Sequence, residues 1–205
     1  MRTLRTLPVL VALLAAACSN NASAPDLKPG EGRMVVQLKD APFDVAEVQS
    51  VDVFVLRVQG KLEETTDADA AADVDGSGGG WLTVAEPNVS IDLLTLSGGN
   101  VATIGQAALA AGTYKSLRLV LDVSKSSVTL KNGTQLTATS QPSIMFPSAG
   151  SSGLKINLDQ PIAIDDGGTT TVLVDFDVGN SFVLRGNTIM QNGLLFKPVI
   201  RATVQ

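Results

Sequence analysis

Alternation of apolar and polar residues is the feature that most restricts what this sequence can fold into. In the run TTTVLVDFDV (169–178), Val172, Val174 and Phe176 share one face of an extended chain, while Asp175 and Asp177 share the other. Similar runs occur at residues 34–39, 50–58, 89–96, 114–123, 153–158 and 194–204. No long stretch has a helical period, so the pattern predicts an all-β domain.

Two local motifs indicate how these strands are connected. Asn132-Gly133 stands between two short strand-like runs and is a strong hairpin signal. Leu109, Gly112 and Tyr114 have the L-x-x-G-x-Y spacing of a tyrosine corner, in which the phenol bonds to the backbone just upstream where the chain crosses between sheets. A chance turn before a strand is the alternative. With roughly nine strands, the motifs favour a Greek-key β-sandwich over a barrel.

The first 17 residues have the organisation of a secretory signal peptide. Arg2 and Arg5 give a positive start, residues 7–14 form an apolar segment too short to span a bilayer, and residues 15–17 are small. Cys18 follows directly, and the arrangement resembles the bacterial lipobox, in which the cysteine is lipidated and becomes the first residue of the mature chain. The departure from that pattern is alanine at position 15, where leucine is usual.

Lipidation gives a role to Cys18, the only cysteine of the sequence, which has no partner for a disulfide within the chain. Ordinary secretion is the alternative, because A-x-A cleavage sites stand at residues 15–17 and 22–24. Ser19 occupies the position where aspartate usually retains a Gram-negative lipoprotein in the inner membrane, so the resemblance implies lipid anchoring to the outer membrane.

Composition divides the mature chain into a tether and one domain. Residues 18–31 are small, polar and rich in proline and glycine, which predicts a lipidated flexible tether before a single domain at 32–205. Loss of the two arginines of the signal peptide takes the formal net charge from −5 to −7. An acidic chain without a basic stripe excludes nucleic acid as a partner.

Six stretches carry a family resemblance: KDAPF (39–43), IDLLTL (91–96), AGTYKSLRL (111–119), PSAGSSGLKI (147–156), DFDVGNSFV (175–183) and KPVIR (197–201). In this order they resemble the DUF4382 family of bacterial lipoprotein domains, over nearly all of the chain after residue 31. The resemblance implies a transthyretin-like, or prealbumin-like, sandwich. It implies no activity, because the family has none assigned.

Catalysis could rest only on carboxylates. The sequence has no histidine and Cys18 is assigned to lipid, so Ser-His, Cys-His and histidine-ligated metal centres are excluded. Asp175 and Asp177 point the same way from one strand with backbones roughly 6 to 7 Å apart, which is compatible with a glycosidase pair. Any strand with polar residues two apart gives this spacing, so we predict no enzyme.

Charge pairing is the interpretation we favour for the polar strand faces. Asp122, Asp175 and Asp177 would then lie opposite basic residues of neighbouring strands on a solvated sheet. The candidate partners are Lys155, Lys197 and Arg201.

Calcium is the cofactor that the acidic residues could bind. Residues 67–80 carry four aspartates, but they lack the first ligand and the closing glutamate of an EF-hand. We therefore interpret residues 61–80 as a mobile acidic, glycine-rich loop, with no cofactor required. Asp40, beside a turn after the first strand, is a second candidate ligand, for which capping of backbone amides is the commoner role.

Trp81, the only tryptophan, is the remaining binding candidate, either as a platform for a sugar or as a core residue, and we favour the core. Together these features predict a membrane-anchored envelope lipoprotein whose sandwich is a binding or structural module for an envelope protein or a carbohydrate. A carboxylate-dependent carbohydrate-active enzyme and a calcium-stabilised adhesion module are the alternatives.

Overall fold

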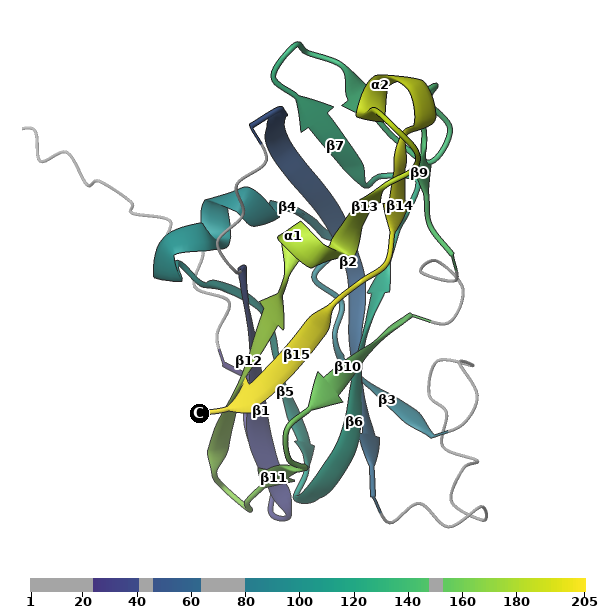
Figure 1. Ribbon diagram of the computed structural model, residues 1–205. Coiled ribbons are helices and arrows are strands. Elements are labelled where there is room, and N and C mark those ends of the chain that lie inside the picture. Colours follow the sequence, from purple (N-terminus) through teal and green to yellow (C-terminus); the bar gives the residue numbers. More distant parts are fainter. Residues whose placement is uncertain (1–23, 41–45, 64–79, 148–152) are drawn as a thin grey trace, which may run out of the picture.

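The computed structural model describes residues 24–40, 46–63, 80–147 and 153–205, and these residues form an all-β fold (Figure 1). Two β layers enclose one hydrophobic core, and a small third sheet covers one end. The all-β sandwich prediction is therefore confirmed, while the finer transthyretin-like resemblance stays a prediction.

The first layer has the strand order β5-β1-β12-β15. Its strands are β1 (Glu31–Asp40), β5 (Ala102–Ala110), β12 (Thr169–Phe176) and β15 (Ile200–Val204). β1 lies parallel to β12 and antiparallel to β5. Val172, Val174 and Phe176 of β12 are fully buried, as the alternation predicts.

The second layer is built around β2, a strand of 15 residues that pairs with β3, β4, β6 and β7. β6 also pairs with β10 and β11, and β7 pairs with β8 through the hairpin that Asn132-Gly133 predicts. The bounds are β2 (Val48–Leu62), β3 (Trp81–Ala85), β4 (Val89–Asp92), β6 (Gly112–Leu121), β7 (Ser127–Leu130), β8 (Gln135–Leu136), β10 (Leu154–Leu158) and β11 (Ile162–Ile164).

The two layers meet along both sides of the sandwich. On one side β10 pairs in parallel with β15, which joins the layers into a continuous sheet. On the other side β3 lies against β5, where Gly105 faces Ala85 at a distance that leaves no room for a side chain. The core is thus closed on both sides by backbone.

Tyr114 ties the crossing from the first layer to the second. Its hydroxyl donates a hydrogen bond to the Ala110 carbonyl at 3.1 Å, four residues upstream, as the motif predicts. Gly112 makes the corner with a φ of 151°, and Leu109 is buried beside it. Burial raises the pKa of the Tyr114 phenol above its ordinary value, so the hydroxyl remains a neutral donor.

A small sheet of order β13-β14-β9 covers the end of the sandwich at the top of Figure 1. Its elements are β9 (Ile144–Met145), α1 (Val178–Ser181), β13 (Phe182–Leu184), α2 (Ile189–Asn192) and β14 (Leu194–Phe196). We call residues 131–147 and 178–197 the cap. The Phe196 ring joins the cap to the core, with centroids 5.2 Å from Phe146, 6.1 Å from Phe176 and 5.0 Å from Phe182.

Two predicted strands are interrupted. In the 89–96 run, β4 ends at Asp92 and the 3₁₀ helix η1 (Leu93–Gly99) follows, because the Asp92 carboxylate accepts a hydrogen bond from the Leu94 amide at 3.1 Å. The 194–204 run divides into β14 and β15 around Pro198, whose nitrogen has no hydrogen to donate to a ladder.

Two boundaries in the structure also differ from the predicted ones. The tether was expected to reach residue 31, but Glu31 already belongs to β1, and the Arg33 guanidinium donates to the Pro25 carbonyl at 2.8 Å. The end of the predicted tether is thus held against the sandwich. The loop expected at 61–80 begins later, because β2 extends to Leu62. Residues 64–79, and with them most of that loop, lie outside the described residues.

Candidate functional site

Asp175 forms an ion pair, but with a residue that the sequence pattern does not indicate. Its Oδ2 lies 2.7 Å from Lys39 Nζ, because the parallel pairing of β1 and β12 puts these residues in register. Arg201 stands opposite Asp175 on β15, as expected. The prediction of an ion pair with Lys155 or Lys197 is wrong, because strand alternation gives faces and says nothing of which strands are neighbours.

Asp177 is the N-cap residue of α1. Its Oδ1 accepts the Asn180 amide at 3.0 Å, and its Oδ2 accepts the Asn180 side-chain amide at 2.7 Å. Asp175 and Asp177 border a hollow of about 250 Å³ with Val199 and Arg201. Their contacts are nevertheless those of an ion pair and a helix cap. No group of three His, Cys, Asp or Glu side chains among the described residues is arranged to hold a metal ion.

Asp122 also satisfies its charge locally rather than across the sheet. Its carboxylate accepts the Ser124 hydroxyl at 2.6 Å and lies 3.2 Å from Lys125 Nζ. The hydrogen bond from Ser124 and the charge of Lys125 lower the pKa of this carboxyl. The turn after β6 thus replaces the predicted cross-strand partner.

Asp40 is a structural residue at the end of β1. It is 4% exposed, and its Oδ1 accepts the Val178 amide at 3.1 Å, at the first residue of α1. The expected capping of a backbone amide is confirmed. Asp40 is the last residue of β1, in register with Phe176 of β12, and the turn expected after it lies outside the described residues.

Trp81 lies on the outside of the second layer. It begins β3 and is partly exposed, and the Arg118 guanidinium sits 4.2 Å from the centroid of its ring. The prediction of a core position is therefore wrong. The cation–π contact with Arg118 occupies one face of this ring.

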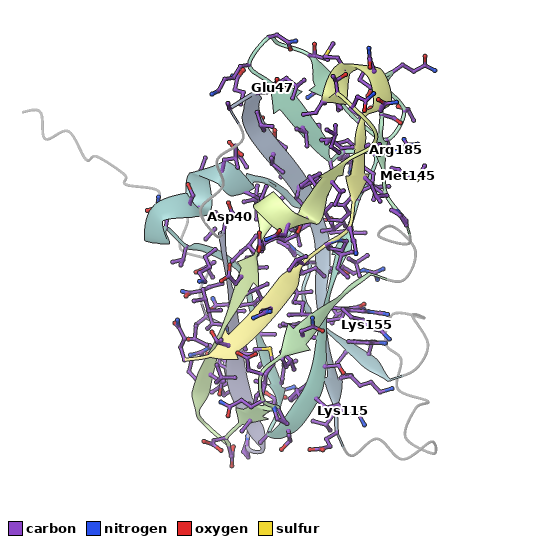
Figure 2. The ribbon with its side chains drawn as sticks, in the orientation of Figure 1. Asp40, Glu47, Lys115, Met145, Lys155 and Arg185 are labelled. Atoms are coloured by element: carbon purple, nitrogen blue, oxygen red, sulfur yellow. The ribbon has the colours of Figure 1, made fainter. Side chains whose placement is uncertain are left out.

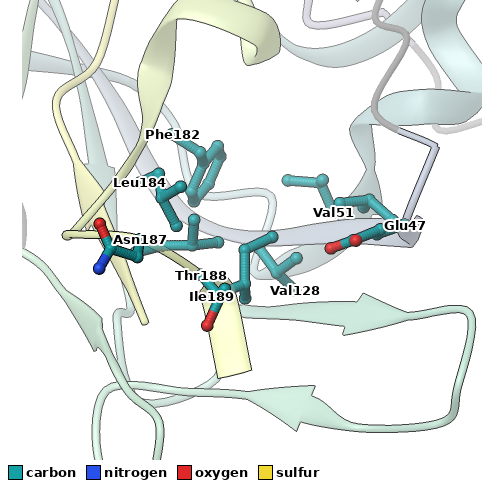
Figure 3. Close-up of a pocket in the computed structure, with 10 residues that line it drawn as sticks. Glu47, Val51, Val128, Phe182, Leu184, Asn187, Thr188 and Ile189 are labelled. Carbon is teal, nitrogen blue, oxygen red and sulfur yellow. The ribbon is translucent and has the colours of Figure 1, made fainter. Parts of the chain in front are cut away.

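An apolar pocket of about 340 Å³ lies between the second layer and the cap (Figure 3). Its size and apolar lining are those of small ligand sites in proteins. Glu47 and Asn187 lie at opposite ends of the lining in Figure 3. The other lining side chains come from β2, β7, β13, β14 and the segment at α2: Val48, Val51, Val128, Phe182, Leu184, Thr188, Ile189 and Leu194.

Local backbone geometry builds the cap side of this pocket. Phe182 and Leu184 alternate with Val183 along β13, so both face the pocket. Gly193 ends α2 with φ 71° and ψ −160°, and a Cβ there would collide with the Ser143 carbonyl. Only glycine permits this conformation and this approach of β14 to β9.

Sequence reasoning missed the pocket because its walls come from separate segments. The DFDVGNSFV stretch contains Phe182, but only as part of a family resemblance. The alternation in β13 covers three residues, which is too short to predict a strand. Contact between β13 and the start of β2 is a tertiary feature with no local signal.

Comparison with protein families matches residues 31–198 to the family described as Domain of unknown function (DUF4382). No curated protein matches the chain. Cys18 and the predicted signal peptide lie outside the described residues. Within the described part of the chain, no helix is both long and apolar enough to cross a membrane.

Proposed function

The chain belongs to the DUF4382 family, and we propose that its domain is a binding module of a lipid-anchored protein of the bacterial cell envelope. The module binds an apolar group in the pocket between the second layer and the cap. No catalytic step is needed, because the carboxylates first considered for catalysis form an ion pair and a helix cap.

The pocket is the observation that carries this proposal. Its walls are aliphatic and aromatic, while Glu47, Asn187 and Thr188 supply the polar groups. This combination is typical of sites that hold an apolar body and orient one polar end. A purely structural module has no need of an open apolar hollow of this size, because closing it would add packing contacts.

Dye binding tests the pocket directly. We expect N-phenyl-1-naphthylamine, a neutral apolar dye, to bind the mature chain saturably with a rise in fluorescence. Leu184→Asp places a charge on the pocket wall and should weaken dye binding by about tenfold or more, because burying an unpaired charge is costly.

Val183→Asp is the matched control for this experiment. Val183 and Leu184 are adjacent in β13 and equally exposed, at 42% and 43%, but only Leu184 lines the pocket. We expect Val183→Asp to change the dye affinity less than about twofold. Equal losses in both variants, or no saturable binding to the wild type, would remove the pocket from the proposal.

The membrane anchor has a separate test. Cys18→Ser removes the thiol that the lipobox-like sequence presents, so the variant should leave the membrane fraction and lose metabolic labelling by palmitate. Ser19→Ala is the control and should remain labelled and membrane-bound. Palmitate labelling that persists in Cys18→Ser would contradict lipidation at this residue.

A further inference from the structure

Three hollows follow one another around α2. The apolar pocket shares Glu47 with a hollow of about 310 Å³, which in turn shares Met190 with one of about 410 Å³. Side-chain amides line the second and third hollows, which suits hydrogen bonding to a polypeptide backbone. These side-chain amides belong to Asn132, Gln141, Gln191 and Asn192. A row of hollows with shared walls fits an extended chain better than a compact molecule.

The cap is the basic end of an acidic protein. Residues 131–147 and 178–197 contain Lys131, Arg185 and Lys197 but no aspartate or glutamate, although the mature chain carries a formal charge of −7. Glu47, the residue before β2, is the carboxylate among the residues that line the pocket. Lys131 and Arg185 against this one carboxylate favour an acidic occupant.

Exposed apolar side chains gather at the same end. Among the described residues, four of the six exposed large hydrophobic residues lie in the cap, namely Met145, Val183, Leu184 and Met190. Figure 2 places Glu47, Met145 and Arg185 at one end of the molecule and Lys115 at the other. Such a gathering marks an interaction surface.

We propose that the cap docks an extended, acidic polypeptide segment of another protein, with one large apolar side chain of that segment in the pocket. This inference rests on the proposed function, because it names the occupant of the same pocket. The row of hollows is the reason for expecting an extended segment, and Lys131 and Arg185 are the reason for expecting an acidic one.

The length of the tether favours a protein over the anchoring bilayer. A lipid on Cys18 is six residues from Ala24, and six residues span at most about 20 Å. Pro25 is held beside Arg33, near the start of β1, whereas the cap lies beyond the other end of that strand. The eight residues from Arg33 to Asp40 alone extend roughly 23 Å. The anchor is thus attached near the Arg33 end, and the cap is the end of the domain farther from the point of attachment.

Two synthetic peptides test the inference on the full mature chain carrying Cys18→Ser. One has nine residues in which glutamate alternates with leucine, and the other has lysine in place of each glutamate. By fluorescence anisotropy we expect the glutamate peptide to bind about tenfold tighter or more. Lys131→Glu/Arg185→Glu should abolish or reverse this preference. Leu184→Asp should weaken binding of the glutamate peptide.

Lys115→Glu/Lys155→Glu is the matched control, since it changes the net charge equally at exposed lysines outside the cap. It should leave the preference for the glutamate peptide unchanged. Equal binding of the two peptides, or loss of preference in this control, overturns the inference. Dye binding without binding of either peptide also overturns it, while the proposed function stands.

Phosphatidylglycerol vesicles distinguish a lipid surface from a polypeptide. We expect the same Cys18→Ser chain not to sediment with these vesicles. Sedimentation that Lys131→Glu/Arg185→Glu abolishes, and that the glutamate peptide does not compete, would assign the cap to anionic lipid and overturn the inference.

Discussion

Replacement of Phe196 by alanine is expected to lower the free energy of unfolding by about 4 kcal/mol. Phe196 is 1% exposed and its ring contacts Phe146, Phe176 and Phe182, so it joins the cap to the core of the sandwich. Truncation leaves a cavity among three aromatic rings that the strands around it cannot close. Urea unfolding followed by circular dichroism measures the loss as a lower midpoint at unchanged slope.

Phe54→Ala is the matched control for Phe196→Ala. Phe54 lies in β2 and is only partly buried, with Lys125 Nζ 4.4 Å from the centroid of its ring. Its truncation removes a surface contact and part of an apolar face, which costs about 1 kcal/mol. If Phe196→Ala cost no more than Phe54→Ala, the cap would not be part of the cooperative core.

The same Phe196 variant links stability to the pocket. Phe182 contacts Phe196 on one side and lines the pocket on the other. Loss of the Phe196 ring frees Phe182 to move into the cavity, so dye affinity should fall together with stability. Dye affinity equal to that of the wild type would mean that the pocket wall does not depend on this aromatic contact.

The faces of the strands were predictable because alternation is a local property. Leu117, Leu119, Val172 and Val174 are buried as their positions predict, since successive side chains of a strand point to opposite sides. The tyrosine corner was predictable for a similar reason, because its hydrogen bond joins residues four positions apart. Local sequence therefore determines burial and the corner.

Strand neighbours were not predictable, because pairing is set by tertiary packing. The parallel pairing of β1 with β12 joins segments more than 130 residues apart and gives Asp175 its partner, Lys39. β5 was missed altogether, since ATIGQAALA is composed mainly of small residues and lacks alternating large apolar side chains. The pocket escaped prediction because the segments that form it are remote from one another in the chain.

The close contact of β3 with β5 gives the second large effect. Gly105→Ala is expected to lower the free energy of unfolding by about 2 to 3 kcal/mol, because a Cβ there would collide with the Ala85 methyl. The new Cβ and the Ala85 methyl are each fixed directly to a strand backbone, so one of the two strands must move. The register of β1 and β5 already shifts beside Gly105, between Val36 and Gln37, so the ladder is irregular at this point.

Ala85→Gly in the Gly105→Ala background makes this prediction specific. On its own Ala85→Gly removes a packed methyl and adds a flexible residue to a strand, and should cost about 1 kcal/mol. In the double variant the new methyl occupies the space that the old one leaves, so we expect more than half of the lost stability to return. If the two substitutions acted independently, their losses of stability would add, and the double variant would be less stable than either single variant. Urea midpoints of the four proteins separate these outcomes, and additive losses would show that the two strands are free to move apart at this side of the sandwich.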